Sequence, residues 1–95
     1  MKKKQNVMPK IRFSKRFTKV YLRLPQEIRE KVKKALTLLE ENPRQPSSQT
    51  KPIKGARGFY EARVDINYRM TYIRLADDTL EMSYVDKHDD ALKNP

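Results

Sequence analysis

The sequence predicts an α+β domain in which two N-terminal helices pack on one face of a small, mainly antiparallel sheet. Three observations predict this class. Apolar residues recur at helical spacing from residue 13 to about residue 42, whereas beyond residue 58 they alternate with polar ones, as in half-buried strands. Between these halves, residues 43–58 hold three of the six prolines and both glycines. With 95 residues the chain is long enough for one modest core.

The helical half is defined by capping residues and prolines. Residues 11–13 are expected to form a short first strand. Ser14 then suits the N-cap of a first helix. Pro25 suits the first turn of a second helix, and the residue before Pro43 is disfavoured in helical geometry, so this helix should end near Asn42.

The second half should be a loop followed by three strands. Residues 43–58 are expected to be irregular because of their prolines and glycines. Strands are expected at 59–65, 68–76 and 80–86, with Asp77-Asp78 as the turn between the last two. A single domain at 10–95, preceded by a basic flexible leader at 1–9, completes the expected organisation.

The chain is strongly basic, with a formal net charge of +10. Residues 1–34 carry thirteen Lys or Arg against two Glu, and residues 51–76 carry six against two. Residues 77–95 reverse the balance, with six acidic and two basic side chains. A basic body favours a polyanionic partner, either nucleic acid, an anionic membrane surface or an acidic protein segment.

Cysteine is absent, so neither a disulfide framework nor a thiolate metal site can form, and a reducing compartment is suitable. Lys2-Lys3-Lys4 is not followed by the apolar stretch of a signal peptide, and no window has the 18 apolar residues of a membrane span. We therefore expect a soluble, cytoplasmic protein without membrane contact. No metal site or cofactor is expected, since one His with nearby Asp is a weak ligand pattern.

Charged residues alternate along the first two long strands. Glu61, Arg63 and Asp65 should share one face, because successive side chains of a strand point to opposite faces. A break at 65–67 would return the chain so that Arg69 lies close to Glu61 and Arg63. A carboxylate among guanidiniums on a rigid sheet is suited to gripping or cleaving a phosphodiester.

Each of these residues also has a structural explanation. Glu61 and Arg63 could form cross-strand ion pairs on a solvated face of the sheet. Arg69 could pair with Asp65 or Glu61. His88, which two aspartates follow, could be a capping or turn histidine.

The ordered set of motifs resembles the RelE/ParE superfamily of toxins from bacterial type II toxin–antitoxin modules. The resemblance covers about residues 11–90 and implies a RelE-like microbial RNase-type fold. It is carried by Leu24-Pro25 through Val32, Leu39 with Asn42-Pro43, Gly55, Tyr60, Arg63, Tyr68-Arg69 and His88.

The resemblance implies a toxin that cleaves mRNA within the ribosome, if the chain belongs to the RelE-like branch. Arg69 matches a phosphate-stabilising arginine of that branch, and Arg63 falls where a functional basic residue occurs. Glu61 replaces the branch's usual lysine base and His88 its late arginine acid, a pair that occurs in other ribosome-dependent members. The C-terminal catalytic tyrosine of several branches has no counterpart.

The chemistry of RNA cleavage assigns roles to these residues. His88, the only histidine, can act as acid or base near pH 7, and Glu61 can serve as the base. Arg63 and Arg69 are the phosphate clamps, because guanidinium does not lose its charge. The basic residues expected to guide the RNA backbone are Lys51, Lys54 and Arg57.

The expected partners are an acidic antitoxin, forming a toxin–antitoxin hetero-oligomer, together with mRNA and the ribosome. The alternative is a non-catalytic binding module, either a ParE-like inhibitor of DNA gyrase or an inactive toxin homologue that binds an antitoxin. The titratable pair beside Arg69 favours the enzyme, whereas the missing terminal tyrosine favours the binding module.

Overall fold

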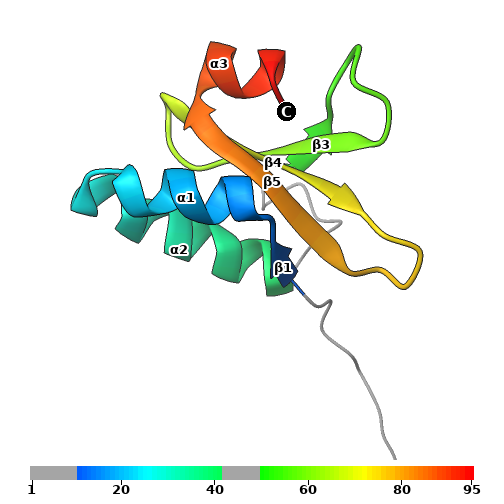
Figure 1. Cartoon of the computed structure of the whole chain (residues 1–95), viewed down its shortest axis with the longest axis horizontal. Coiled ribbons are helices and arrows are strands. Elements are labelled where there is room, and N and C mark those ends of the chain that lie inside the picture. The colour runs from blue at the N-terminus through cyan, green and yellow to red at the C-terminus, as the bar shows by residue number, and fades with distance from the viewer. Residues whose placement is uncertain (1–10, 42–49) are drawn as a thin grey trace, which may run out of the picture.

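A computed structural model describes residues 11–41 and 50–95 (Figure 1). The elements are β1 (Ile11–Phe13), α1 (Lys15–Arg23), α2 (Gln26–Glu41), β2 (Thr50–Pro52), β3 (Phe59–Arg63), β4 (Tyr68–Arg74), β5 (Leu80–Lys87) and α3 (His88–Lys93). The α+β class expected from the sequence is confirmed. The leader expected at 1–9 and the helix boundary expected at Asn42 lie outside the described residues.

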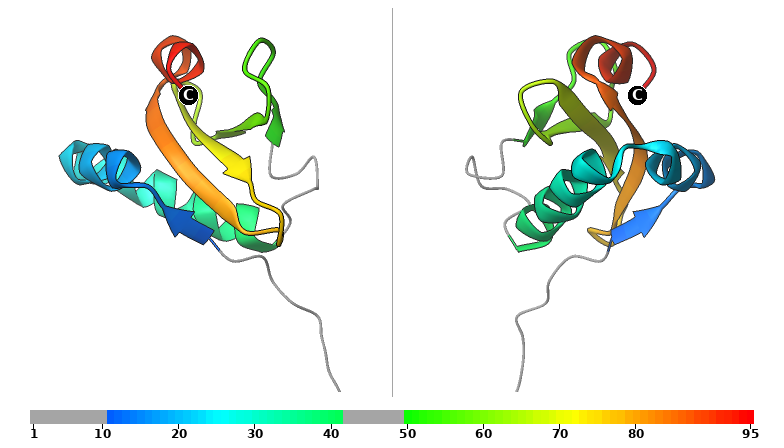
Figure 2. Two further views of the ribbon diagram at one scale, coloured as in Figure 1. Left: turned by 45° about the vertical axis from the view of Figure 1, so that its right-hand side comes forward. Right: turned by 90° about the vertical axis from the view of Figure 1, so that its left-hand side faces the viewer.

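The five strands form one sheet in the order β1-β5-β4-β3-β2. β1 runs parallel to β5, and every other neighbouring pair is antiparallel. Figure 1 and Figure 2 show α1 and α2 on the same side of the molecule, with α3 at the end of the sheet where β5 finishes. The loop between β2 and β3 rises at that same end.

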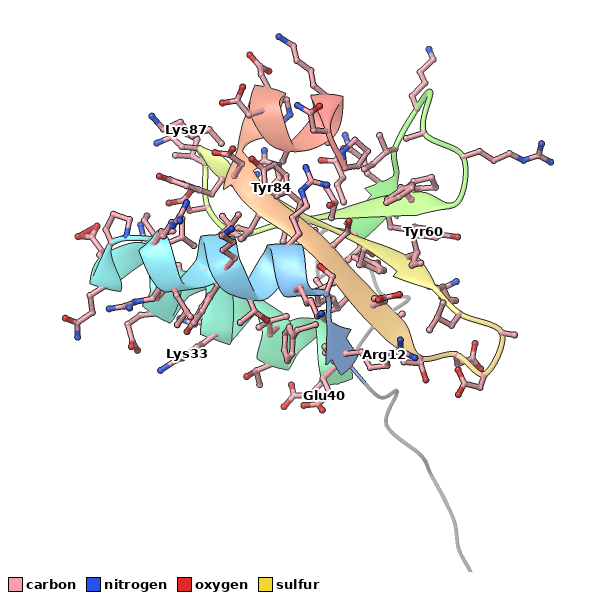
Figure 3. All side chains as sticks on the ribbon, viewed as in Figure 1. Arg12, Lys33, Glu40, Tyr60, Tyr84 and Lys87 are labelled. Atoms are coloured by element: carbon pink, nitrogen blue, oxygen red, sulfur yellow. The ribbon has the colours of Figure 1, made fainter. Side chains whose placement is uncertain are left out.

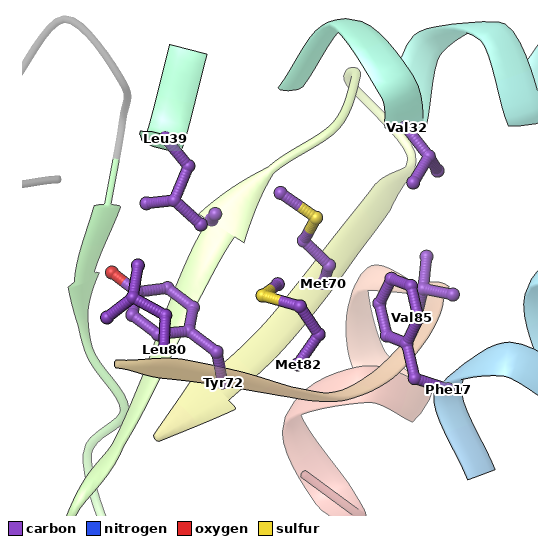
Figure 4. Packing of buried hydrophobic residues seen from close by; sticks show 9 residues of the cluster. Phe17, Val32, Leu39, Met70, Tyr72, Leu80, Met82 and Val85 are labelled. Atoms are coloured by element: carbon purple, nitrogen blue, oxygen red, sulfur yellow. The ribbon is translucent and has the colours of Figure 1, made fainter. Parts of the chain in front are cut away.

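One face of the sheet carries the hydrophobic core. Val32 and Leu39 of α2 lie fully buried against it, and Phe17 of α1 covers its edge (Figure 4). The strands contribute Ala62, Met70, Tyr72, Leu80, Met82 and Val85. No helix among the described residues has the length and apolar character needed to cross a membrane.

The expected N-cap of the first helix is confirmed, and Pro25 lies directly before α2 rather than in its first turn. The Ser14 side chain accepts a hydrogen bond from the Phe17 N–H at 3.0 Å, as an N-cap should. The α1 helix ends at an extended Leu24, and the Pro25 carbonyl then accepts from Ile28 to begin α2. Ser14 also donates to the Ser83 carbonyl at 3.1 Å, so the cap joins α1 to β5.

The long strands lie where the alternation predicted them, although β3 and β4 each end two residues early. The turn at Asp77-Asp78 is confirmed. The Asp78 N–H donates to the Leu75 carbonyl, and Asp78 takes a positive φ of 68°. Aspartate tolerates this left-handed conformation better than most residues.

Two elements correct the sequence prediction. Residues 50–52 are not part of a loop but form β2, which pairs with β3. Three residues are too few to show an alternating pattern, and Pro52 is tolerated because β2 lies at the edge of the sheet. The helix α3 was not expected, because it has only six residues and its N-cap residue, Lys87, supplies no capping side chain.

Candidate active site

The face of the sheet opposite the core carries the candidate residues, and we call it the polar face. The strand register places Glu61, Thr71 and Tyr84 side by side across β3, β4 and β5. The next row contains Arg63, Arg69 and Asp86. Lys51 on β2 extends the first row beside Glu61. The shared face predicted for Glu61, Arg63 and Arg69 therefore follows from the observed register.

The turn between β3 and β4 is fixed by the Asp65 carboxylate. One carboxylate oxygen accepts hydrogen bonds from the N–H groups of Asn67 and Tyr68, both at 2.8 Å. The other lies 3.2 Å from Nζ of Lys31 on α2. Desolvation raises the pKa of Asp65, but the two N–H groups and the Lys31 ammonium outweigh it and hold the pKa below its ordinary value.

Arg69 is held at this turn by its own guanidinium. Its Nη1 donates to the Asp65 carbonyl at 2.6 Å and to the Tyr68 carbonyl at 2.9 Å. Its Nε lies 3.6 Å from Oε1 of Glu61, and the two side chains are only 15% and 7% exposed. Arg69 thus pairs with the Glu61 carboxylate and with the main chain of Asp65, so it has little freedom to move.

An open hollow of about 910 Å³ lies beside Arg69, between the β3–β4 turn and α3. Its lining comprises Ile66, Asn67, Tyr68, Arg69, Lys87, His88, Asp89, Asp90 and Lys93. The lining carries four basic side chains from β4, β5 and α3, counting His88, next to two aspartates. Figure 3 labels Lys87, the last residue of β5, which is one of the lining residues.

His88 is attached to the same turn through its backbone. Its N–H donates to the Asn67 carbonyl at 2.7 Å, and its ring Nδ1 lies 3.0 Å from Oδ1 of Asp89. The side chain is 46% exposed. The His88 N–H and the Asp65 carboxylate both bind Asn67, so one three-residue turn positions both Arg69 and His88.

The structure brings only part of the predicted site to the hollow. Arg69 and His88 line it, whereas Glu61 reaches it only through the ion pair with Arg69. Glu61 is 5% exposed and therefore does not lie on a solvated face. Arg63 lies opposite Arg69 in the register of β3 and β4.

The residues predicted to guide RNA lie farther along the sheet edge. Lys51 stands opposite Glu61 on β2. Lys54 and Arg57 lie in the loop between β2 and β3, whose shape requires positive φ angles of 87° and 86° at Gly55 and Gly58. Neither basic side chain of this loop lines the hollow.

Sequence reasoning missed the polar pair on β5. The Tyr84 hydroxyl donates to Oδ2 of Asp86 at 2.6 Å, and this hydrogen bond together with burial raises the pKa of Tyr84. The Arg16 guanidinium lies over the Tyr84 ring at 3.8 Å. Their spacing of two residues indicates that Tyr84 and Asp86 share one face of β5. The register between β4 and β5 is needed to show that this is the face of Arg69.

The described residues contain no cluster of side chains suited to a metal ion, since no three His, Asp or Glu side chains gather closely enough there to hold one. The arrangement instead offers permanent cations, a buried carboxylate and an exposed imidazole. Such a set can bind a phosphate and transfer protons around it.

Comparison with known proteins identifies the fold. No protein-family model and no curated protein sequence matches the chain. Among solved structures, it is similar to the intact E. coli RelBE toxin–antitoxin complex, with a TM-score of 0.69 and 23% identity over 84% of this chain and 96% of that one. The RelBE2 toxin–antitoxin complex of Mycobacterium tuberculosis gives a TM-score of 0.71 and 23% identity, with coverage of 86% and 100%.

A third similar structure is the E. coli DinJ–YafQ complex, with a TM-score of 0.64, 25% identity and coverage of 86% and 96%. The chain therefore has the fold found in these toxin–antitoxin structures across nearly its whole length. The structural resemblance predicted from the sequence is confirmed as one of fold.

The role of Asp65 can be tested through acid stability. Asp65→Asn removes the charge that holds Lys31 and the turn, so the free energy of unfolding at pH 7 should fall by about 1 kcal/mol. Because the folded-state pKa is lowered from 3.8, this contribution is present above pH 4 and is lost as the pH falls through the folded-state value. Urea unfolding of both proteins between pH 2.5 and 7 measures the difference.

Glu30→Gln is the matched control, because Glu30 pairs with Lys33 on the exposed side of α2, where an ion pair contributes little. A difference between wild type and Asp65→Asn that stayed constant down to pH 2.5 would show that the charge of Asp65 does not stabilise the turn.

Proposed function

We propose that this protein is the toxin of a type II toxin–antitoxin pair and that it cleaves mRNA on the ribosome. The observation that supports this most directly is Arg69, which is anchored by two carbonyls and one carboxylate at the edge of a hollow that it shares with His88. A permanently charged, immobile guanidinium beside an imidazole is suited to phosphodiester chemistry.

The proposed reaction is attack of the 2′-hydroxyl on the adjacent phosphate. A base removes the 2′ proton, cations stabilise the pentavalent phosphate, and an acid protonates the departing 5′-oxygen. The new bond joins the 2′-oxygen to phosphorus, and the bond to the 5′-oxygen breaks. No cofactor is required, because the atoms and protons balance within the substrate, the acid and the base.

Arg69 and Arg63 are the proposed phosphate ligands. They face each other across β3 and β4, so one phosphate could contact both. Arg69 already uses Nη1 for the two main-chain carbonyls and Nε for Glu61, which leaves the N–H groups of Nη2 to the phosphate.

His88 is the proposed acid. Its Nδ1 is held by Asp89, so Nε2 is the ring nitrogen that would give a proton to the 5′-oxygen. Glu61 is the proposed base, and its ion pair with Arg69, the proposed phosphate ligand, supports this role. Its burial also allows another role, in which Glu61 acts by positioning Arg69, and the pH dependence of cleavage separates the two roles.

The remaining parts of the proposal concern the partners. Lys51, Lys54 and Arg57 lie toward the β2 edge and would contact the RNA backbone or the ribosome. Several of the solved structures similar to this chain are RelE–RelB and DinJ–YafQ complexes. We therefore propose an acidic antitoxin, a hetero-oligomer with it and a cytoplasmic location, with residues 10–95 as the toxin domain.

An apolar groove offers the antitoxin a docking surface. It has a volume of about 360 Å³ and lies between β1, α1 and α2, lined by Phe13, Phe17, Thr18, Tyr21, Leu22, Lys33 and Leu36. Phe13 and Leu22 are 50% and 63% exposed, which is unusual for large apolar side chains in a chain this basic. An amphipathic acidic segment would cover them and contact the surrounding cations.

Arg69→Ala should abolish growth arrest and mRNA cleavage. Loss of one transition-state ligand costs about 10²–10³-fold in rate. Arg69→Lys should recover only part of the activity, because an ammonium lacks the forked geometry. Primer extension on transcripts from cells expressing the toxin without its antitoxin measures cleavage directly.

Arg12→Ala is the control for a lost surface cation, since Arg12 lies on β1 and is 63% exposed. Growth arrest with intact transcripts would contradict the nuclease proposal. A DNA supercoiling assay would then test inhibition of gyrase.

Glu61→Gln and His88→Gln should each slow single-turnover cleavage about 10²-fold or more while ribosome binding stays unchanged. Both substitutions preserve size and hydrogen bonding but remove titration. The pH–rate profile should lose its acid limb in Glu61→Gln and its basic limb in His88→Gln. A Glu61→Gln enzyme that is slow but keeps the wild-type profile would show that Glu61 only positions Arg69.

Antitoxin binding should depend strongly on salt. The association rate should fall about tenfold or more between low and high ionic strength, because screening shortens the reach of the positive field. Leu22→Ala should instead speed dissociation, because it removes apolar contact from the docked state. Stopped-flow measurements across a salt series determine the association and dissociation rates separately. If the association rate did not change with salt, the basic surface would serve RNA or the ribosome and would not attract the antitoxin.

A further inference from the structure

Residues Asn94 and Pro95 lie against the polar face, next to the candidate active site. The main-chain oxygen of Pro95 accepts hydrogen bonds from the Thr71 hydroxyl at 2.9 Å and from the Ser83 hydroxyl at 2.5 Å. The Arg16 guanidinium donates to the main-chain oxygen of Asn94. Figure 1 shows this end of the chain lying beside the sheet beneath α3.

The donors of this contact belong to rigid parts of the fold. Thr71 is fully buried in β4, so its hydroxyl is directed at the Pro95 oxygen by packing. Ser83 sits at a register irregularity, because Thr71 pairs with Tyr84 whereas Tyr72 pairs with Met82. Such a bulge redirects a side chain, and here it sets the Ser83 hydroxyl beside that of Thr71.

Arg16 is also held in place. Its guanidinium carbon lies 3.8 Å from the centroid of the Tyr84 ring, a cation–π contact that restrains the guanidinium. Two hydroxyls and one guanidinium therefore converge on two successive main-chain oxygens. This donor set is the one expected for an oxyanion, and the guanidinium favours phosphate most.

Other charged groups limit where the anion can lie. Glu61 is the register neighbour of Thr71 on the β3 side, and Asp86 on β5 accepts a hydrogen bond from the Tyr84 hydroxyl. An anion must therefore sit toward Ser83 and Arg16. Arg69 precedes Thr71 by two residues on the same strand and face, at a separation of about 7 Å. Successive phosphates of an extended single strand can span such a distance.

We propose that Thr71, Ser83 and Arg16 form a second phosphate subsite, which Asn94 and Pro95 occupy until an RNA strand displaces them. The RNA identity of the ligand rests on the proposed function, whereas the anion subsite does not. The Asn94–Pro95 segment and the phosphate cannot occupy the subsite at the same time. The apparent affinity for RNA is therefore lower the larger the fraction of molecules in which this segment is bound.

The test uses an all-2′-deoxy oligonucleotide, which cannot undergo 2′-hydroxyl attack. A chain that stops at Lys93 should bind this probe about fivefold more tightly than the full chain, because Asn94 and Pro95 no longer compete with the probe for the subsite. Thr71→Val in the shortened chain should reverse the gain. Arg16→Ala should do the same, whereas Arg12→Ala, a change of equal charge at β1, should retain most of it.

The full chain provides an independent measurement. In ¹H–¹⁵N NMR spectra, the probe should shift the amide signals of Thr71 and Ser83 and move that of Asn94 to the position of an unstructured residue. Inorganic phosphate at high concentration should shift Thr71 and Ser83 in the same direction. Saturating probe that leaves the Asn94 signal in place would overturn the proposal, as would equal affinity of the full and shortened chains.

Failure of this proposal is distinguishable from failure of the proposed function. Binding of the deoxy probe requires no cleavage, and cleavage on the ribosome is measured separately. Tighter binding by the shortened chain without mRNA cleavage would keep the subsite and refute the nuclease. If the protein cleaves mRNA but the full and shortened chains bind the probe equally, the nuclease proposal is supported and the subsite is refuted.

Discussion

The Asp65 carboxylate is the interaction on which the candidate site depends. It binds two consecutive backbone N–H groups of the β3–β4 turn and receives the Lys31 ammonium from α2. The turn in turn offers the carbonyls that hold Arg69 and the Asn67 carbonyl that holds the His88 backbone. One side chain thus links the helical layer, the sheet and α3.

Arg69 is fixed by neutral carbonyls more than by opposite charge. Its contact with Glu61 at 3.6 Å is longer than a hydrogen bond, whereas the two carbonyls lie within 2.9 Å. Carbonyls orient a guanidinium without neutralising it, so the positive potential remains available to an incoming anion. A closer carboxylate would satisfy Arg69 and weaken its attraction for phosphate.

The sequence was sufficient for what depends on periodicity and local chemistry. Ser14, Pro25 and Asp78 mark their caps and turns by residue type, and the alternation of β3 and β4 placed Glu61, Arg63 and Arg69 on one face. It was insufficient for β2 and α3, which are too short to carry a pattern. Tyr84 and Asp86 were missed because their relation to Arg69 depends on the β4–β5 register, and the bulge at Ser83 shifts that register.

The same strands must supply apolar side chains to the core on one face of the sheet and polar side chains to the other face. Met70 and Tyr72 must fill the core, so the residues between and beside them are the ones left for the polar face. Thr71 is nevertheless fully buried, and the Asn94–Pro95 segment contacts its hydroxyl. A buried hydroxyl requires a partner, and the Pro95 oxygen supplies one. Any ligand that removes this segment must replace that hydrogen bond, which favours an oxyanion over an apolar group.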